Sequence, residues 1–136
     1  MTTASQILIV GGMSLLFFGL LMGIPMLVAR SKAPHPPRYL FATHLVPIIQ
    51  GGVLLALTAA VEFSALSPTW NTIGASALLA GMVFFVLGLA VNWRQGVADA
   101  FAENAPGGKI SGIGLPLVLG GAGILFFGVL AGIPGA

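Results

Sequence analysis

The side chain best suited to chemistry in this sequence is His44, because it lies inside residues 40–61, a stretch without Asp, Glu, Lys or Arg. Ionisable side chains within apolar spans are costly, and imidazole is a common ligand of metals and of haem iron. A histidine in this position equally suits a hydrogen bond to a neighbouring helix. Two roles are therefore open for His44, as a ligand and as a structural hydrogen-bonding residue.

The neighbours of His44 bear on both roles. Pro47 leaves the Thr43 carbonyl without its usual donor, which predicts a kink that opens space. Gly51 lies near the same helix face as His44 and leaves room for a flat macrocycle or for another helix. Gln50 carries an amide that could donate to a bound oxygen or to a neighbouring helix.

Three further polar residues are candidates for the same site. Asn92 is expected at the end of the third helix, as a catalytic residue or as a helix cap. Arg38 and Arg94 are expected at the level of His44, where they would meet carboxylates such as haem propionates, or lipid phosphates. His35 stands among prolines and is expected in solvent. With one histidine at membrane depth, a bound iron would keep an open face, which suits ligand binding or Lewis-acid chemistry.

The composition shows which elements must position these residues. Of 136 residues, 57% are hydrophobic and 6% are charged, whereas soluble domains carry roughly a quarter charged residues. This excludes a soluble globular domain and a disordered chain. Five Lys and Arg residues are too few for nucleic-acid binding. The absence of Cys excludes thiolate metal sites and covalently attached haem.

Long uncharged stretches predict an all-α integral membrane four-helix bundle in one domain, residues 1–136. The helices are expected at about 6–29, 39–61, 72–92 and 111–133, because a span needs about 20 apolar residues. The connection 94–109 is expected to be closed by Pro106, Gly107 and Gly108. Small residues four apart, at Gly19 and Gly23 and at Gly128 and Gly132, favour close helix contacts and a homo-oligomer.

An internal repeat links the first and last helices. Residues 11–25 and 120–134 share ten of fifteen positions, in helices expected to run in opposite directions. Inverted repeats can frame a transport pathway. Alternatively, both helices use the same packing solution.

The order of features resembles the styrene oxide isomerase family over most of the chain. The segment Ala42-Thr43-His44, with Pro47 and then Gln50-Gly51, resembles that family's second helix. Residues 11–23, 73–92 and 125–132 are similar to its first, third and fourth helices. The resemblance implies a haem b cofactor with His44 on the iron, and a homotrimer that holds haem between subunits. It also implies ferric haem acting as a Lewis acid that converts an epoxide to an aldehyde or ketone without net redox change.

Two positions depart from the family pattern. The family has Asn where Gln50 stands, so the amide is kept but moved by one methylene. The family uses a third-helix Tyr to orient the epoxide, and Gly88 occupies that position here. We therefore expect a membrane haem b isomerase acting on a small apolar substrate such as an aryl epoxide. The alternatives are a noncatalytic haem protein, as a sensor or a subunit of a larger complex, and a small transporter, although no carboxylate lies within a span.

The basic residues predict the orientation in a membrane, expected to be a bacterial inner membrane. Arg30, Lys32 and Arg38 fall in the first connection, Arg94 and Lys109 fall in the third, and the second has none. The positive-inside rule places these connections in the cytoplasm and both termini outside.

This orientation is tested with a phosphatase fused to the C-terminus, which is active only outside the cytoplasm. We expect activity from the fusion, with a fluorescent protein fused at the same point as the reciprocal control. A fusion that is active only in the cytoplasm would reverse the orientation and move His44 to the outer half of the membrane.

Overall fold

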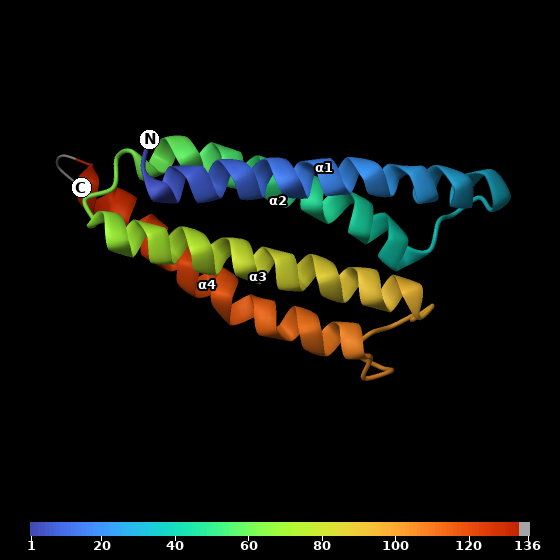
Figure 1. The fold of residues 1–136 in the computed structure, drawn as a ribbon. Helices are drawn as coiled ribbons and strands as arrows, with labels where there is room; N and C mark the ends of the chain where they lie inside the picture. Colours follow the sequence, from blue (N-terminus) through green and yellow to red (C-terminus); the bar gives the residue numbers. More distant parts are fainter. Residues whose placement is uncertain (134–136) are drawn as a thin grey trace.

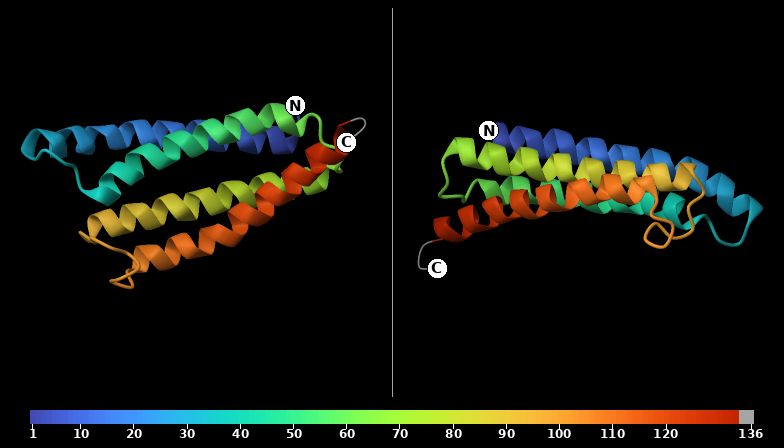
Figure 2. Two further views of the ribbon diagram at one scale, coloured as in Figure 1. Left: turned by 180° about the vertical axis from the view of Figure 1, so that it is seen from behind. Right: turned by 90° about the horizontal axis from the view of Figure 1, so that it is seen from below.

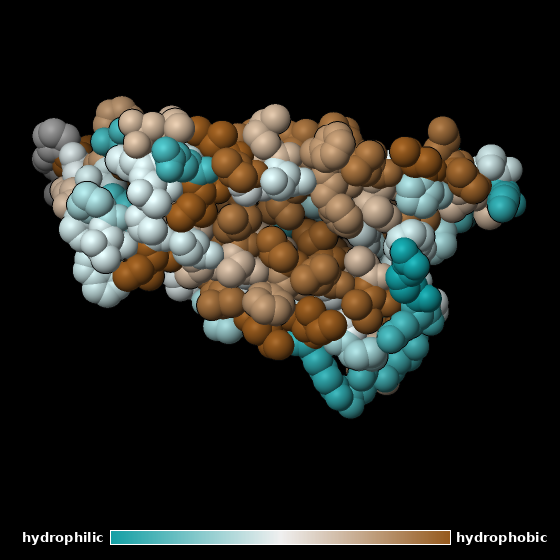
Figure 3. Space-filling view, viewed as in Figure 1, coloured by the Kyte–Doolittle hydropathy of each residue, from teal (hydrophilic) through white to brown (hydrophobic). Residues whose placement is uncertain are grey.

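The computed structural model describes residues 1–133, which form four α-helices. These are α1 (Thr3–Lys32), α2 (Arg38–Val61), α3 (Pro68–Arg94) and α4 (Pro106–Gly132) (Figure 1). All four are long and apolar enough to cross a membrane, and apolar side chains cover the middle of the face shown in Figure 3. The all-α class and the four candidate spans are confirmed. Pro134, the last residue of the repeat, lies outside the described residues.

All four helices begin before their predicted boundaries, and α1 and α3 also end beyond them, whereas α2 ends at Val61 as predicted and α4 ends one residue early at Gly132. Polar caps on α1 and α3 and prolines at the start of α3 and α4 account for part of the earlier starts. Thr2 caps α1 by accepting from the Ser5 N–H at 3.1 Å. α3 begins with Pro68 after the capping residue Ser67. The expected closure of the third connection by Pro106, Gly107 and Gly108 is wrong, since these residues form the first turn of α4. Proline suits this position because the first helical N–H has no partner within the helix.

The helices form two antiparallel pairs, α1 with α2 and α3 with α4 (Figures 1 and 2). The pairs join through contacts of α3 with α1 and α2, around a core that includes Leu8, Leu54, Leu78 and Leu125. The N-terminus and the end of α4 lie at one end of the bundle. The connections 33–37 and 95–105 lie at the other end. We call it the basic end, because all five Lys and Arg residues lie in the helix turns next to these two connections.

Glycines spaced seven residues apart bring α3 and α4 into backbone contact. Seven residues are about two helical turns, so each set lies on one face. A Cβ built on Gly81 would lie 2.6 Å from the Val118 nitrogen, and one on Gly121 would lie 2.6 Å from the Gly74 oxygen. The four-residue spacing predicted from the sequence does not include this longer spacing. The contacting glycines are Gly74, Gly81 and Gly88 on α3, and Gly107, Gly114 and Gly121 on α4.

The pair α1 and α2 uses the same device. A Cβ on Gly12 would lie 2.9 Å from the Gly51 oxygen, and one on Gly19 would lie 3.0 Å from the His44 oxygen. Gly12 and Gly121 are equivalent positions of the internal repeat, and each packs against the backbone of its own neighbouring helix. At this pair of positions the repeat serves helix packing, which is the second of the two interpretations, and no observation here bears on transport.

The glycine contact predicts that a change from glycine to alanine affects the stability of the protein differently at two sites on α3 and α4. Gly81→Ala is expected to destabilise the protein by about 1–3 kcal/mol, because the added methyl group meets backbone atoms that cannot move alone. Gly120→Ala is the matched control, since nothing lies within 4 Å of a Cβ there. It should be neutral or stabilising by up to about 1 kcal/mol through helix propensity. Thermal unfolding in detergent measures both, and equal shifts would contradict the packing.

Candidate functional site

His44 is half-buried on α2 and forms a hydrogen bond to α1. Its Nδ1 lies 2.7 Å from the carbonyl oxygen of Gly19. A carbonyl oxygen only accepts, so Nδ1 carries the proton and donates it. In the neutral ring, Nε2 therefore keeps its lone pair. This arrangement ties two helices together and also has the form of a metal-binding histidine, whose second nitrogen donates to a carbonyl or carboxylate.

Gly23 makes the space in which the His44 ring lies. A Cβ on Gly23 would be 3.3 Å from Cε1 of His44, the carbon between the two ring nitrogens. Gly19 and Gly23 are one helical turn apart, so they share a face of α1. The close helix contact predicted from their spacing is present. Gly19 meets the backbone of α2, and Gly23 meets the imidazole of His44.

The other second-helix candidates are divided between faces. A Cβ on Gly51 would lie 2.6 Å from the Gly12 oxygen, so α1 fills the space beside Gly51, as in the helix-contact alternative. α2 continues through the fully buried Pro47 to Val61. Pro47 was expected to open space beside His44. The structure shows α1 there instead, with Gly19 and Gly23 in contact with His44.

Gln50 follows His44 by six residues, which places it about 120° around the helix. It lies four residues from both Val46 and Leu54, which pack in or against the core. Its Oε1 is buried and has no hydrogen-bond partner within residues 1–133. A buried amide oxygen without a partner is costly, and the fold tolerates that cost at Gln50.

Asn92 belongs to the other helix pair. Only 2% of its surface is exposed, and its side chain packs against Gly107 of α4. The capping alternative is wrong, because α3 ends at Arg94 with Gln95 as its C-cap. Like Gln50, it has a buried amide oxygen, Oδ1, with no partner in the described part of the chain. The structure therefore places Asn92 in the α3–α4 contact and His44 in the α1–α2 contact.

The arginines and His35 are exposed at the basic end. Backbone N–H groups of Ala102 and Phe101 hold the pKa of Asp99 below its usual value, and Arg38 contributes to the same effect by its charge. Arg38 is therefore near enough to Asp99 for its charge to act on this carboxylate. The expectation that His35 is exposed is confirmed.

Two polar contacts were not found from the sequence, because they join residues far apart in the chain. The fully buried Ser5 donates its hydroxyl to Glu62 Oε1 at 2.8 Å, at the end opposite the basic end. The Tyr39 hydroxyl accepts the Ala100 N–H at 2.9 Å and fixes the 95–105 connection to α2. Single polar residues at helix ends were the only sequence signal for these contacts.

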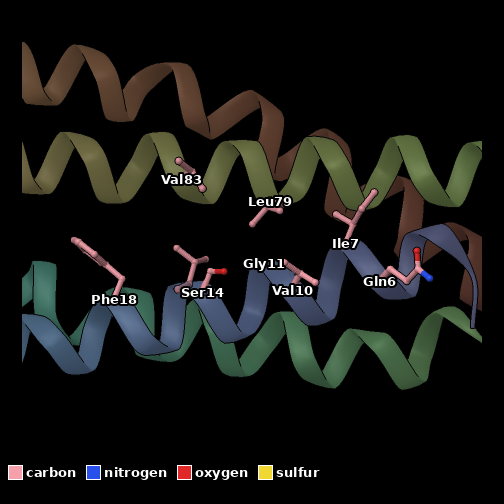
Figure 4. A pocket seen from close by; sticks show the side chains of 9 residues that line it. Gln6, Ile7, Val10, Gly11, Ser14, Phe18, Leu79 and Val83 are labelled. Carbon is pink, nitrogen blue, oxygen red and sulfur yellow. The ribbon is translucent and has the colours of Figure 1, made fainter.

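A groove of about 600 Å³ lies between α1 and α3 (Figure 4). Its lining is mostly apolar, with Val10, Phe18, Leu79 and Val83 among the residues that form it. Ser14 and Gln6 supply the polar side chains of this groove, and His44, Gln50 and Asn92 do not line it. The groove thus offers no imidazole to a metal or to a haem.

Comparison with known proteins gives no match for this chain among protein-family models, curated proteins or solved structures. The resemblance to the styrene oxide isomerases therefore stays a prediction. Residues 1–133 contain no group of three His, Cys, Asp or Glu side chains that could hold a metal ion. A haem iron needs only one axial protein ligand, because the macrocycle supplies four nitrogens.

The space at Gly23 predicts a dependence of stability on His44. Gly23→Val should displace the imidazole and lower the unfolding temperature more than Gly52→Val, where nothing lies within 4 Å of a Cβ. Both changes introduce the same β-branched residue into a helix. In a His44→Ala background the difference between them should disappear, because the crowded ring is gone. An unchanged difference in that background would show that Gly23 serves another contact.

Proposed function

We propose that the protein is a membrane haem b protein with His44 as the axial ligand, and that it isomerises an epoxide to an aldehyde or ketone. The observation that carries the proposal is the hydrogen bond from Nδ1 of His44 to the Gly19 carbonyl at 2.7 Å. It holds the ring in one orientation and leaves Nε2 as the atom with a free lone pair. Iron-binding histidines require that protonation state.

The residues around His44 fit a haem on the outer side of the α1–α2 pair. The inner side is filled, because Gly51 contacts the backbone of α1. On the outer side Phe41 and Leu45, three residues before and one after His44, are exposed apolar side chains. Such a surface needs a cover, and in this proposal a neighbouring copy in a homotrimer supplies it. Arg38 and Arg94, both exposed at the basic end, are the candidate partners of the propionates.

When bound, ferric haem would supply a Lewis acid for the epoxide oxygen, and the isomerisation moves no net electrons. The chain's own contribution would be one ligand for the iron, Nε2 of His44. The apolar helices also exclude water, which would otherwise add to the opening epoxide and give a diol. Gln50 lies on another face of α2 than His44, and Asn92 lies on α3. An amide acting on the substrate would therefore come from a neighbouring copy.

A noncatalytic haem protein is the second candidate, favoured by the surroundings of Gly88. A Cβ there would clash with the Gly107 oxygen and with Ser111, so no larger side chain fits where the resemblance implies a tyrosine. Haem ligation requires His44 alone, whereas isomerisation also requires groups that orient the epoxide. A sensor or a subunit of a larger complex would need only the first.

The haem proposal is tested by the visible spectrum of protein purified after expression with ample haem. We expect a Soret band that His44→Ala reduces or abolishes and that His35→Ala, the matched control, leaves intact. Carbon monoxide, cyanide and imidazole should each shift the spectrum, because one axial position is free. A wild-type protein without haem would remove the proposal and leave His44 as a structural residue.

The isomerase proposal is tested separately on the haem-loaded protein. An aryl epoxide such as styrene oxide should give its aldehyde without an added electron donor. Gln50→Leu should slow this turnover by about tenfold or more while the Soret band is kept, if the amide orients the substrate oxygen. Bound haem without turnover of any aryl epoxide would favour the noncatalytic candidate.

A further inference from the structure

A cleft of about 390 Å³ lies at the basic end, between α3, α4 and the 95–105 connection. This volume is within the range of small-molecule sites. Five of its lining side chains carry hydrogen-bond donors: Tyr39, Asn92, Asn104, Lys109 and Ser111, of which Ser111 already donates to the Phe85 carbonyl. Phe85, Leu89 and Leu115 supply an apolar wall. The cleft is thus polar in one part and apolar in another, at the end of a bundle whose helices are apolar enough to span a membrane.

The two buried polar residues of the cleft have donors to offer. Asn92 is 2% exposed, and its Oδ1 packs against Gly107 without a hydrogen-bond partner in residues 1–133. Asn92 lines the cleft, and the NH₂ group of its amide carries two hydrogen-bond donors. Tyr39 is 8% exposed, and its hydroxyl oxygen accepts from the Ala100 N–H. The hydroxyl proton of Tyr39 is then available to a second partner.

The beginning of α4 adds positive potential to the cleft. α4 has no side-chain cap and no acidic residue in its first turn, and Gly108 and Lys109 of that turn line the cleft. The N–H groups of Gly108 and Lys109 donate to the Ala105 oxygen at 3.0 and 3.4 Å. The start of α4 therefore favours an anion through the positive end of the helix dipole rather than through free N–H groups. The ammonium group of Lys109 has the same preference.

The carboxylates of the 95–105 connection do not oppose this charge within the lining. Glu103 Oε1 accepts the backbone N–H groups of Ala98 and Asp99 at 2.8 and 2.9 Å. Asp99 Oδ1 accepts those of Phe101 and Ala102 at 2.9 and 3.2 Å. Both carboxylates are used to fold the connection itself, and neither lines the cleft.

We propose that this cleft binds an amphiphile with an anionic head, a carboxylate or a phosphate, and an apolar tail. The head accepts from Asn92, Tyr39 and Lys109 near the start of α4, and the tail lies along Phe85, Leu89 and Leu115. A free fatty acid and a single-chain lysophospholipid share this chemistry. The proposal does not depend on haem, because His44 is not among the residues that line the cleft.

The test uses the full chain in nanodiscs of neutral phosphatidylcholine, with radiolabelled palmitate and radiolabelled lysophosphatidic acid as separate probes. We expect saturable binding of one or both, and the tighter probe identifies the head as carboxylate or phosphate. Palmitate methyl ester should compete at least tenfold more weakly than palmitate, because it carries no charge. Equal competition by the ester, or no saturable binding of either probe, would overturn the proposal.

Two glycines of α4 provide a matched pair of variants. A Cβ on either Gly112 or Gly120 meets nothing within 4 Å, but only Gly112 is part of the cleft lining. Gly112→Phe should fill the cleft and abolish saturable binding, whereas Gly120→Phe should bind like the wild type. Asn92→Leu and Lys109→Gln should each weaken binding by about tenfold, the equivalent of one hydrogen bond of about 1.4 kcal/mol. Equal binding by the two phenylalanine variants would overturn the proposal, and unfolding temperatures confirm that both are folded.

Discussion

The contact of backbone with backbone at glycines is the constraint on which this structure depends. Side chains of ordinary size would hold the helices apart, and lipid offers helices little hydrophobic reason to associate. At Gly81 and Gly121 a single added Cβ would meet backbone atoms of the facing helix at 2.6 Å. The positions of these glycines therefore determine which helices pair closely. Two of the polar side chains, His44 and Asn92, lie within or beside these contacts.

The position of His44 in such a contact gives one hydrogen bond two consequences. The Gly19 carbonyl at 2.7 Å holds α1 to α2 through the imidazole, and it also determines which nitrogen carries the proton. A structural role and a ligand role for His44 are thus compatible, because they use different nitrogens. Asn92 has an analogous place in the α3–α4 contact, where its amide meets Gly107 on one side and the cleft on the other.

The sequence predicted the four helices and the common end of the basic residues, because uncharged length and charge position are local properties. It misplaced the beginning of α4, since Pro106 and two glycines resemble a loop until the packing against Gly88 is seen. Which helices pair depends on glycines seven residues apart on facing helices, which becomes clear only once the partner is known. The separation of Asn92 from His44 follows from that pairing, whereas Gln50 is separated from His44 by the helical period of α2 itself. The individual residues of the candidate site could therefore be predicted from the sequence, but the helix pairing that separates Asn92 from His44 could not.

The protonation state of the His44 ring is the most direct measure of this account. In a His35→Ala variant His44 is the only histidine, so ¹⁵N spectra of histidine-labelled protein report on it alone. At a pH where imidazole is neutral, and without added haem, the account predicts a proton on Nδ1 and an unprotonated Nε2. A ring protonated on Nε2, with Nδ1 bare, could not donate to Gly19 and would contradict both the helix contact and the proposed ligand.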